Sequence, residues 1–452
     1  VTGVQTCALP ISRKLRLPAA RPSSSRRGTG YAVNNKLWQS LANAWMLPEL
    51  RTKVLFTAAM LAIYRLGAHV PVPGINVDAL ESLFSQGAAG VLGFLDMFSG
   101  GALRRVTLFA LGIMPYITAS IIMQLLTVVI PKLEELAKEG EQGQKQITKY
   151  TRYLTVVLST LQAIGYVFVF RSQGAFFDLT WWKAVLIVVS LVAGAVFVMW
   201  LGELITARGI GNGMSILIFV SIISRIPSGS AQLFTMGAVT ISLFVIIALA
   251  VVVGVVWITS GERRVPVQYA KRVVGRRMMG GQSTFIPLKV NMAGVIPVIF
   301  ASSVMMIIPT FTSFFGTDGL AGWFTDNFGP SSFPFIVFEA VLIVVFTYFY
   351  TAVTFNPIDQ ADNLKKYGGF IPGVRPGRPT AEFLDRILTR LTFPGALFLA
   401  ALAVLPWLMT LVLNVPFYFG GTSLLIVVGV ALDTMRQMEA QLLMRHYEGF
   451  LK

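Results

Sequence analysis

Ten long apolar segments constrain this chain more than any other feature. A membrane-crossing helix needs roughly 20 predominantly apolar residues, and the 452-residue chain is 55% hydrophobic and 13% charged. Such segments can satisfy their backbone polar groups inside a bilayer only as helices, because they lack the alternation of barrel strands. The sequence therefore predicts an all-α integral membrane protein. Its predicted spans are Val54–Val70, Val106–Ile130, Leu154–Phe170, Ala184–Ile205, Met214–Ile226, Ala238–Ile258, Met292–Phe315, Phe333–Phe355, Phe393–Leu413 and Thr422–Met435.

The distribution of Lys and Arg predicts how these helices are oriented. Basic residues gather in the connections after the second, sixth and eighth segments, whereas the connections after the seventh and ninth carry none. Connections rich in Lys and Arg stay on the cytoplasmic side of a membrane. We therefore expect both chain ends to be cytoplasmic, with residues 442–452 forming a cytoplasmic tail.

Residues 1–32 do not follow this pattern. They begin with "VTGVQTCALPI", which resembles a translated sequencing adapter, and continue as an Arg/Ser/Pro-rich stretch without apolar periodicity. We interpret them as an artefactual extension, with a disordered basic tail as the alternative. The single cysteine, Cys7, lies here, so we expect neither a disulfide nor a cysteine metal site in the helical part.

Ionisable residues inside the predicted spans lie toward the span ends. They are Arg65, His69, Glu203, Glu339 and Asp433. Such positions favour snorkelling or pairing near the interfaces over a coupling site at mid-depth. This placement weighs against an ion-driven secondary transporter of a small solute, which remains the alternative function.

Enzyme chemistry and cofactors are not expected. The "GIGNG" stretch at Gly209–Gly213 has no preceding strand that would make it a nucleotide-binding loop, so we expect a tight turn that opens a helix. The sequence shows no catalytic triad pattern, no HExxH motif, and only two histidines, His69 and His446. We therefore predict no catalytic residues, no metal site and no cofactor.

The stretch "GVLGFLDMFSGGALRR", Gly90–Arg105, is apolar in its first half but too short to span a bilayer. It breaks at Ser99-Gly100-Gly101 before the next long apolar run. A short helix is tolerated at membrane depth where protein or a water-filled cavity surrounds it. The alternative is an amphipathic helix on the outer interface.

Two long connections, about 260–291 and 355–392, combine basic clusters with aromatic residues and Gly-Pro turns. Positive charge there can simply enforce topology. Connections in helical bundles are commonly only 2–8 residues long, so these two also suggest docking of an acidic partner or of RNA phosphate.

Several long motifs resemble the bacterial SecY family of protein-translocation channels. They are "MFSGGALRR", "FALGIMPYITASIIMQLLTVV", "RGIGNGMSILIF", "QSTFIPLKVNMAGVIPVIFASS", "ADNLKKYGGFIPGVRPG" and "VPFYFGGTSLLIVVGVALD". The resemblance extends from about Leu37 to the C-terminus, in family order. Residues 1–32 have no counterpart in it.

The resemblance implies two inverted five-helix halves, 33–236 and 237–441, around an hourglass pore. A re-entrant plug at about 90–101 closes the pore, which opens sideways between segments two and three on one side and seven and eight on the other. The implied pore ring is Ile113, Ile117, Ile218, Ile299 and Ile426. The implied plug includes Val91, Leu92, Phe94, Leu95, Met97, Phe98, Gly100 and Gly101. The implied lateral gate includes Thr118, Gln124 and Ile308, and the implied docking residues are Lys271, Arg276, Arg277 and Arg375.

The resemblance also implies a function and partners. The chain would be the pore-forming subunit of a Sec translocase in a bacterial inner membrane, conducting unfolded preproteins that carry an apolar signal segment. SecE-like and SecG-like small subunits would join it among the membrane lipids. A SecA motor ATPase or a translating ribosome would dock on the two cytoplasmic loops and supply the energy.

Overall fold

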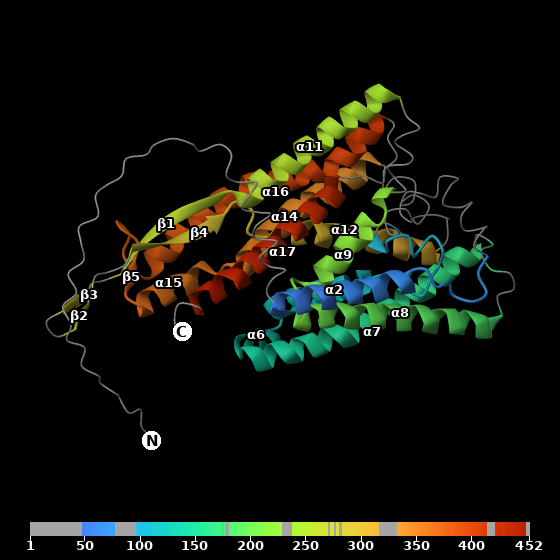
Figure 1. The fold of residues 1–452 in the computed structure, drawn as a ribbon, viewed down its shortest axis with the longest axis horizontal. Helices are drawn as coiled ribbons and strands as arrows, with labels where there is room; N and C mark the ends of the chain where they lie inside the picture. Colours follow the sequence, from blue (N-terminus) through green and yellow to red (C-terminus); the bar gives the residue numbers. More distant parts are fainter. Residues whose placement is uncertain are drawn as a thin grey trace, which may run out of the picture. The chain divides into compact units, whose positions relative to one another are not determined.

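All ten segments predicted to span the membrane overlap helices in the computed structural model. The helices that overlap them are α2 (Pro48–Gly67), α5 (Met114–Val129), α7 (Glu141–Ser172), α8 (Trp181–Arg208), α9 (Gly213–Ile223), α11 (Ala238–Ser260), α12 (Ile296–Phe315), α14 (Phe333–Thr354), α16 (Arg378–Leu413) and α17 (Gly421–Glu448) (Figure 1). The structure describes residues 48–76, 96, 98–172, 174, 176, 180–227, 237–269, 272–274, 277–279, 283–315, 332–413 and 421–448.

Five of these helices are long and apolar enough to cross a membrane, or six if the bent pair of α5 and α6 (Pro131–Lys138) counts as one span. The two helices of that pair meet at 100°, where Pro131 forces Ile130 into an extended conformation. Others fall short individually, since α9 has only 11 residues. The chain is thus a helical protein of membrane type, and the number of ten spans stays a prediction.

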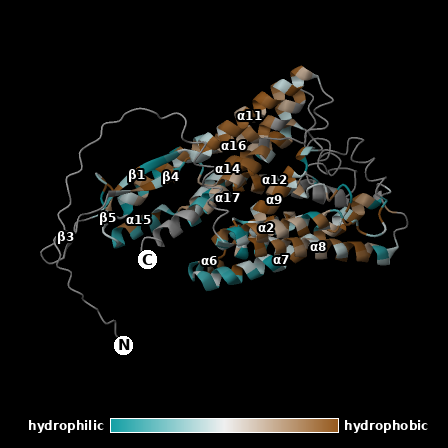
Figure 2. Cartoon of the chain, viewed as in Figure 1, coloured by the Kyte–Doolittle hydropathy of each residue, from teal (hydrophilic) through white to brown (hydrophobic). Residues whose placement is uncertain are grey.

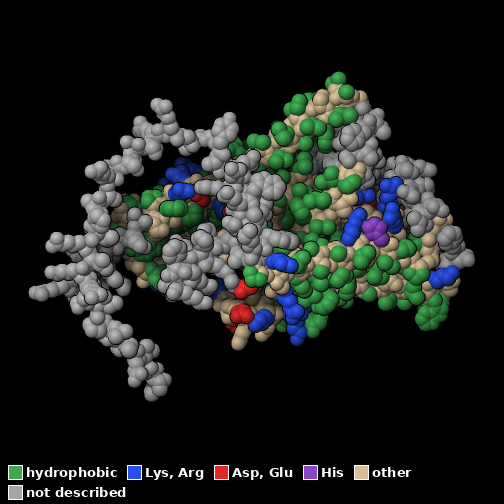
Figure 3. Space-filling model, viewed as in Figure 1, with side chains coloured by type: hydrophobic (Ala, Val, Ile, Leu, Met, Phe, Trp, Pro, Cys, Tyr) green, Lys and Arg blue, Asp and Glu red, His purple; other side chains and the backbone are tan. Residues whose placement is uncertain are grey.

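Large apolar side chains cover the outer faces of the helices. In α11, Val239, Leu249 and Trp257 are 80%, 67% and 76% exposed, and the helix is apolar along its length (Figure 2). Figure 3 shows hydrophobic side chains spread over much of one face of the molecule. Exposed apolar surface on this scale suits contact with lipid rather than with water.

Two helices begin well before their predicted spans, and α17 continues to Glu448, past its predicted end at Met435. The helix α7 begins at Glu141 and α16 begins at Arg378, each more than ten residues before the predicted span. The added part of α16 buries Leu384 and Ile387 and exposes Arg386, which is the pattern of an amphipathic helix. Apolar content alone marks only the section inside the bilayer, so it misses such extensions.

The second predicted span is shorter than expected. Helix α5 begins at Met114 rather than at Val106. The preceding residues form turns, with Gly112 at a positive φ of 57°, and they return to the end of α2 through a hydrogen bond from the Leu108 N–H to the Val70 carbonyl (2.9 Å). The apolar run before α5 is therefore a folded turn segment instead of the start of a helix.

The all-α prediction is wrong for the two long connections. Strands β1 (Glu262–Tyr269) and β4 (Ser283–Lys289) form an antiparallel ladder, and β5 (Gly369–Phe370) pairs with the other edge of β1. Strands β2 (Arg272–Val274) and β3 (Arg277–Met279) pair separately. The second connection holds the helix α15 (Pro357–Lys366). Strand pairing satisfies backbone groups that lie outside the helices.

Candidate functional site

Five isoleucines from separate elements meet in the main hydrophobic cluster. Ile113 precedes α5 and Ile117 lies in its first turn, while Ile218, Ile299 and Ile426 come from α9, α12 and α17. Four of them are at most 8% exposed, and Ile299 is partly buried against the same cluster. These are the five residues that the motif resemblance assigned to the ring; they share this large cluster, and the ring itself stays a prediction.

A cavity of about 680 Å³ borders three of these isoleucines, Ile117, Ile218 and Ile299. Elements α5, α7, α8, α9 and α12 form its wall. Away from these isoleucines the wall mixes apolar side chains, such as Trp200, Leu204 and Phe300, with polar ones: Ser120, Gln124, Thr148, Arg152, Glu203, Thr206, Asn212 and Ser215. Three residues of the predicted ring therefore line the same cavity as these polar side chains.

One ion pair lies in the wall of this cavity. Arg152 Nε of α7 approaches Glu203 Oε1 of α8 at 2.8 Å. Glu203 is one of the ionisable residues predicted to pair near a span end, and it does have a partner. Because the two charges balance, the described part of the cavity wall carries no net charge.

The turn at Gly209–Gly213 begins α9 at the cavity side. Asn212 caps the helix by accepting hydrogen bonds from the N–H groups of Met214 and Ser215 (3.0 and 3.4 Å). Gly211 has a φ of +73°, and Gly213 lies so close to Gly202 that a Cβ would collide with its carbonyl oxygen. The predicted tight turn that opens a helix is confirmed.

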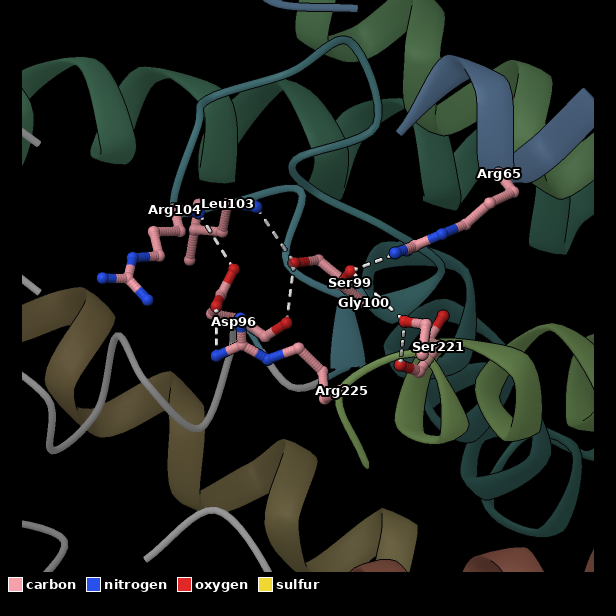
Figure 4. A network of polar contacts seen from close by, with 9 residues as sticks. Arg65, Asp96, Ser99, Gly100, Leu103, Arg104, Ser221 and Arg225 are labelled. Atoms are coloured by element: carbon pink, nitrogen blue, oxygen red, sulfur yellow. Dashed lines mark hydrogen bonds and ion pairs between the residues drawn. The ribbon is translucent and has the colours of Figure 1, made fainter. Parts of the chain in front are cut away.

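The other end of α9 contacts the turn around Ser99, Gly100 and Gly101 (Figure 4). Both glycines have positive φ, 68° and 88°. The Gly100 carbonyl accepts hydrogen bonds from Arg65 Nη1 of α2 (3.0 Å) and from the Ser224 hydroxyl (3.4 Å). This turn, which holds the predicted plug residues Gly100 and Gly101, is therefore seated against α2 and the end of α9.

Asp96 organises this turn from a fully buried position. Its Oδ2 pairs with Arg225 Nη2 at 2.8 Å, and its Oδ1 accepts the Arg104 N–H at 2.9 Å. Its backbone carbonyl accepts the Gly101 N–H (3.0 Å) and the Ser99 hydroxyl (3.1 Å). Burial raises the pKa of the Asp96 carboxyl above its ordinary value, and the Arg225 guanidinium opposes that shift.

Most predicted plug residues lie outside the described residues. Phe98, at the end of that stretch, is 1% exposed and belongs to the same hydrophobic cluster as the isoleucines. The expectation that 90–99 forms a short helix therefore stays a prediction. The residues concerned are Val91, Leu92, Phe94, Leu95 and Met97.

Helix α12 packs against both α5 and α7. The predicted lateral gate lies at this contact. Thr118 is buried, and its hydroxyl donates to the Met114 carbonyl at 3.1 Å. Gln124 lines the cavity. The side chain of Ile308, in α12, lies outside the described residues.

Comparisons with known proteins agree on one family. Residues 107–435 match SecY. The chain is 50% identical over 435 residues to the protein translocase subunit SecY of Streptomyces scabiei, covering 91% of this chain and 99% of that one. It is 50% identical over 431 residues to that of Mycobacterium bovis, covering 89% and 97%. The chain belongs to the SecY family.

Solved structures show the same fold. This SecY-family chain is similar to a protein-conducting channel, with a TM-score of 0.60 and 19% identity over 88% of this chain and 96% of that one. It is also similar to Sec61 in the canine ribosome-channel complex from the endoplasmic reticulum, with a TM-score of 0.54 and 18% identity over the same shares. At these identities the likeness concerns the fold alone.

The two basic connections of this SecY-family chain form one surface element. Strands β4, β1 and β5 make a three-stranded sheet over a core that includes Val265, Leu288 and Leu384. Arg375 is exposed, and its carbonyl accepts the Thr380 hydroxyl at 2.8 Å. The predicted docking residue Arg277 begins β3, whereas Lys271 and Arg276 lie outside the described residues.

Sequence reasoning missed Asp96 and Arg225 as site residues. The signal available was that Asp96 is the single ionisable residue in the apolar stretch Gly90–Phe98, and a charge in such a stretch calls for a partner. Nothing in the sequence indicates which arginine that partner is. Among the described residues, no group of three or more His, Cys, Asp or Glu side chains could hold a metal ion.

Proposed function

We propose that this chain is the pore-forming subunit of a Sec preprotein translocase. It conducts unfolded polypeptides across the membrane and releases apolar segments sideways into the bilayer. One observation carries this proposal: the five isoleucines share a single hydrophobic cluster, and three of them line a cavity together with polar side chains. Family membership and the likeness to protein-conducting channels support it.

The isoleucine ring acts as the gate. A narrow apolar passage sheds water and so resists ions. Branched aliphatic side chains can also move apart around a polypeptide without breaking hydrogen bonds. The cavity beneath the ring opens at the ends of α7, α8 and α9 that are predicted to be cytoplasmic, so an unfolded chain reaches the ring from that side.

The segment 90–101 is the plug on the outer side of the ring. Support comes from helix α9, which carries Asn212 at the cavity, Ile218 in the ring, and Ser224 at the Gly100 turn. The ring therefore lies between the cytoplasmic cavity and the base of the plug. Among the solved relatives in fold is a SecY protein whose plug domain stabilises the closed state and maintains a membrane seal, with a TM-score of 0.57.

Lateral release occurs where α12 meets α5 and α7. Helix α12 contacts both α5 and α7, and the Thr118 hydroxyl at this seam bonds within its own helix instead of across to α12. Helices held mainly by packing can part without leaving charges unpaired. An apolar segment of the substrate can then pass from the cavity into lipid.

The partners follow from the same proposal. SecE-like and SecG-like subunits accompany the chain in a bacterial inner membrane, with both chain ends in the cytoplasm and the halves 33–236 and 237–441 around the pore. A SecA motor or a ribosome docks on the sheet that carries Arg375. The alternative, an ion-driven transporter of a small solute, finds no support in the comparisons.

Disulfide trapping of a stalled substrate tests the proposal. In a Cys7→Ser background, Ile218→Cys should cross-link to a cysteine in a preprotein arrested during secretion. The matched control is Val253→Cys on the 61% exposed face of α11, which should not cross-link. A secretion-competent channel whose Ile218→Cys variant never captured the arrested chain would rule out this path.

A further inference from the structure

The base of the proposed plug, meaning Asp96 and the turn at Ser99–Gly101, contacts the end of α9 through one buried ion pair. Asp96 is fully buried, the Arg225 side chain is 16% exposed, and their charged atoms lie 2.8 Å apart. We propose that Asp96 and Arg225 are positioning residues that hold the plug base against α9 in the resting channel. This inference rests on the plug assignment made above.

Asp96 has two functions that can be separated. Its backbone carbonyl and Oδ1 bond within the turn itself, to the N–H groups of Gly101 and Arg104. Its Oδ2 faces outward to Arg225, which follows the last turn of α9. Replacing Arg225 therefore removes the ion pair to the end of α9. The Ser224 hydrogen bond and the internal bonds of the turn stay in place.

The turn fits closely against α9 around this pair. A Cβ on Gly100 would lie 3.2 Å from the Ser221 Cα, and one on Gly101 would lie 3.3 Å from Arg225 Nη1. Both glycines have positive φ. The Arg65 guanidinium and the Ser224 hydroxyl also donate hydrogen bonds to the Gly100 carbonyl, which is an uncharged acceptor. The seat is specific in shape, and within the described residues Asp96–Arg225 is its ion pair. Two other cations are close: Arg65 donates to the Gly100 carbonyl, and Arg104 acts electrostatically on the Asp96 carboxylate.

The same pair connects the plug base to the ring. Arg225 lies seven residues after Ile218, which is about two helical turns, so a pull on the turn acts on the segment that carries a ring residue. Charges separated in a low-dielectric site are costly until water reaches them. The Asp96–Arg225 pair thus favours two states, paired and dry or separated and hydrated. A substrate that opens the ring admits the water.

Resting conductance across a planar bilayer, measured without substrate, tests the pair. We expect Arg225→Gln to raise the resting open time at least about tenfold, because a buried carboxylate without its partner no longer favours the seated turn. Arg225→Lys keeps the charge and should stay near the parent. The matched control is Arg105→Gln, which removes an exposed arginine from the same segment.

A second pair of measurements separates positioning from folding. The double variant Asp96→Asn with Arg225→Gln leaves no buried charge unpaired, so it should fold, and it should leak no more than Arg225→Gln alone. Secretion of a preprotein with a shortened apolar signal should rise several-fold in both variants. General loss of structure would instead lower secretion of every substrate.

Deletion of residues 91–97 provides the reference for the plug itself. If the deletion leaks and Arg225→Gln stays silent, the ion pair does not position the plug, and the plug assignment stands. If both stay silent, the plug assignment fails and this inference fails with it. If Arg105→Gln leaked as much as Arg225→Gln, the inference would also be overturned. Loss of any positive charge near the plug would then open the channel, whether or not it pairs with Asp96.

Discussion

Gln268 in β1 pairs in antiparallel register with Phe370 in β5, which joins two basic connections that are far apart in the sequence. The paired strands pack over buried residues from both connections, among them Val267 and Ile371. Because the sheet has its own apolar core, it can present charged side chains in fixed positions. The proposed docking surface is therefore supported by its own core.

Reversing the charge of Arg375 should uncouple the motor without unfolding the channel. Arg375 is exposed, and surface substitutions usually change stability by no more than about 0.5 kcal/mol. We expect motor-driven secretion by reconstituted Arg375→Glu channels to fall strongly while thermal unfolding is unchanged. Arg51→Glu, an exposed charge on α2, is the control. Secretion at the parental rate would remove Arg375 from the docking surface.

Replacing two ring residues with glycine should make the resting channel leak. Ile117→Gly with Ile299→Gly removes two apolar walls and lets water bridge the constriction. Single-channel conductance without substrate should rise, and deletion of residues 91–97 in the same background should raise it further. If the folded double variant were as silent as the parent, these isoleucines would not line the constriction.

The control for the double ring variant carries the same number of glycine substitutions in a helix, so that their effect on helix stability is matched. Leu249→Gly with Val253→Gly places two glycines on the exposed face of α11, where the side chains are 67% and 61% exposed. Each glycine costs about 1 kcal/mol relative to alanine in a helix interior, so folding must be checked in both pairs by copurification with the SecE-like subunit. The control pair should fold and remain closed.

Truncating Leu288 should loosen the docking sheet and spare the helices. Leu288 is fully buried in β4, and a buried Leu→Ala change typically costs 2–5 kcal/mol. In Leu288→Ala we expect faster amide hydrogen exchange in β1 and β5 and weaker motor binding, with exchange in α8 unchanged. Phe285→Ala, at a 49% exposed position of the same strand, should have little effect. Unaltered exchange in β5 would mean that the sheet does not depend on this core.

Adding one methyl group at Gly213 should destabilise the start of α9. A Cβ there would collide with the Gly202 carbonyl oxygen and lie 2.8 Å from the Ile205 Cβ. Overpacking of this kind costs about 1–3 kcal/mol, so Gly213→Ala should lower the melting temperature in detergent. Gly237→Ala makes the same change where nothing lies within 4 Å and should melt with the parent. Equal melting of both variants would show that α8 can shift to make room.

The sequence by itself determined that this is a helical protein of membrane type. Apolar runs of bilayer length leave the backbone only one way to satisfy its polar groups, and all ten segments overlap helices. Helix ends were less predictable, because α7 and α16 continue beyond the apolar run as amphipathic helices. Family motifs indicated which isoleucines to inspect, although Ile218 and the exposed Val253 are both branched aliphatic residues.

Only the tertiary structure decided which residues act together. The alternation of Val265, Val267 and Tyr269 was visible, but so short a run does not specify a strand until β4 and β5 supply its partners. Asp96 in an apolar stretch required a counter-charge, yet many arginines were available in the sequence. Packing of α9 against the glycine turn selects Arg225, because ion pairing depends on distance in space, which sequence order does not contain.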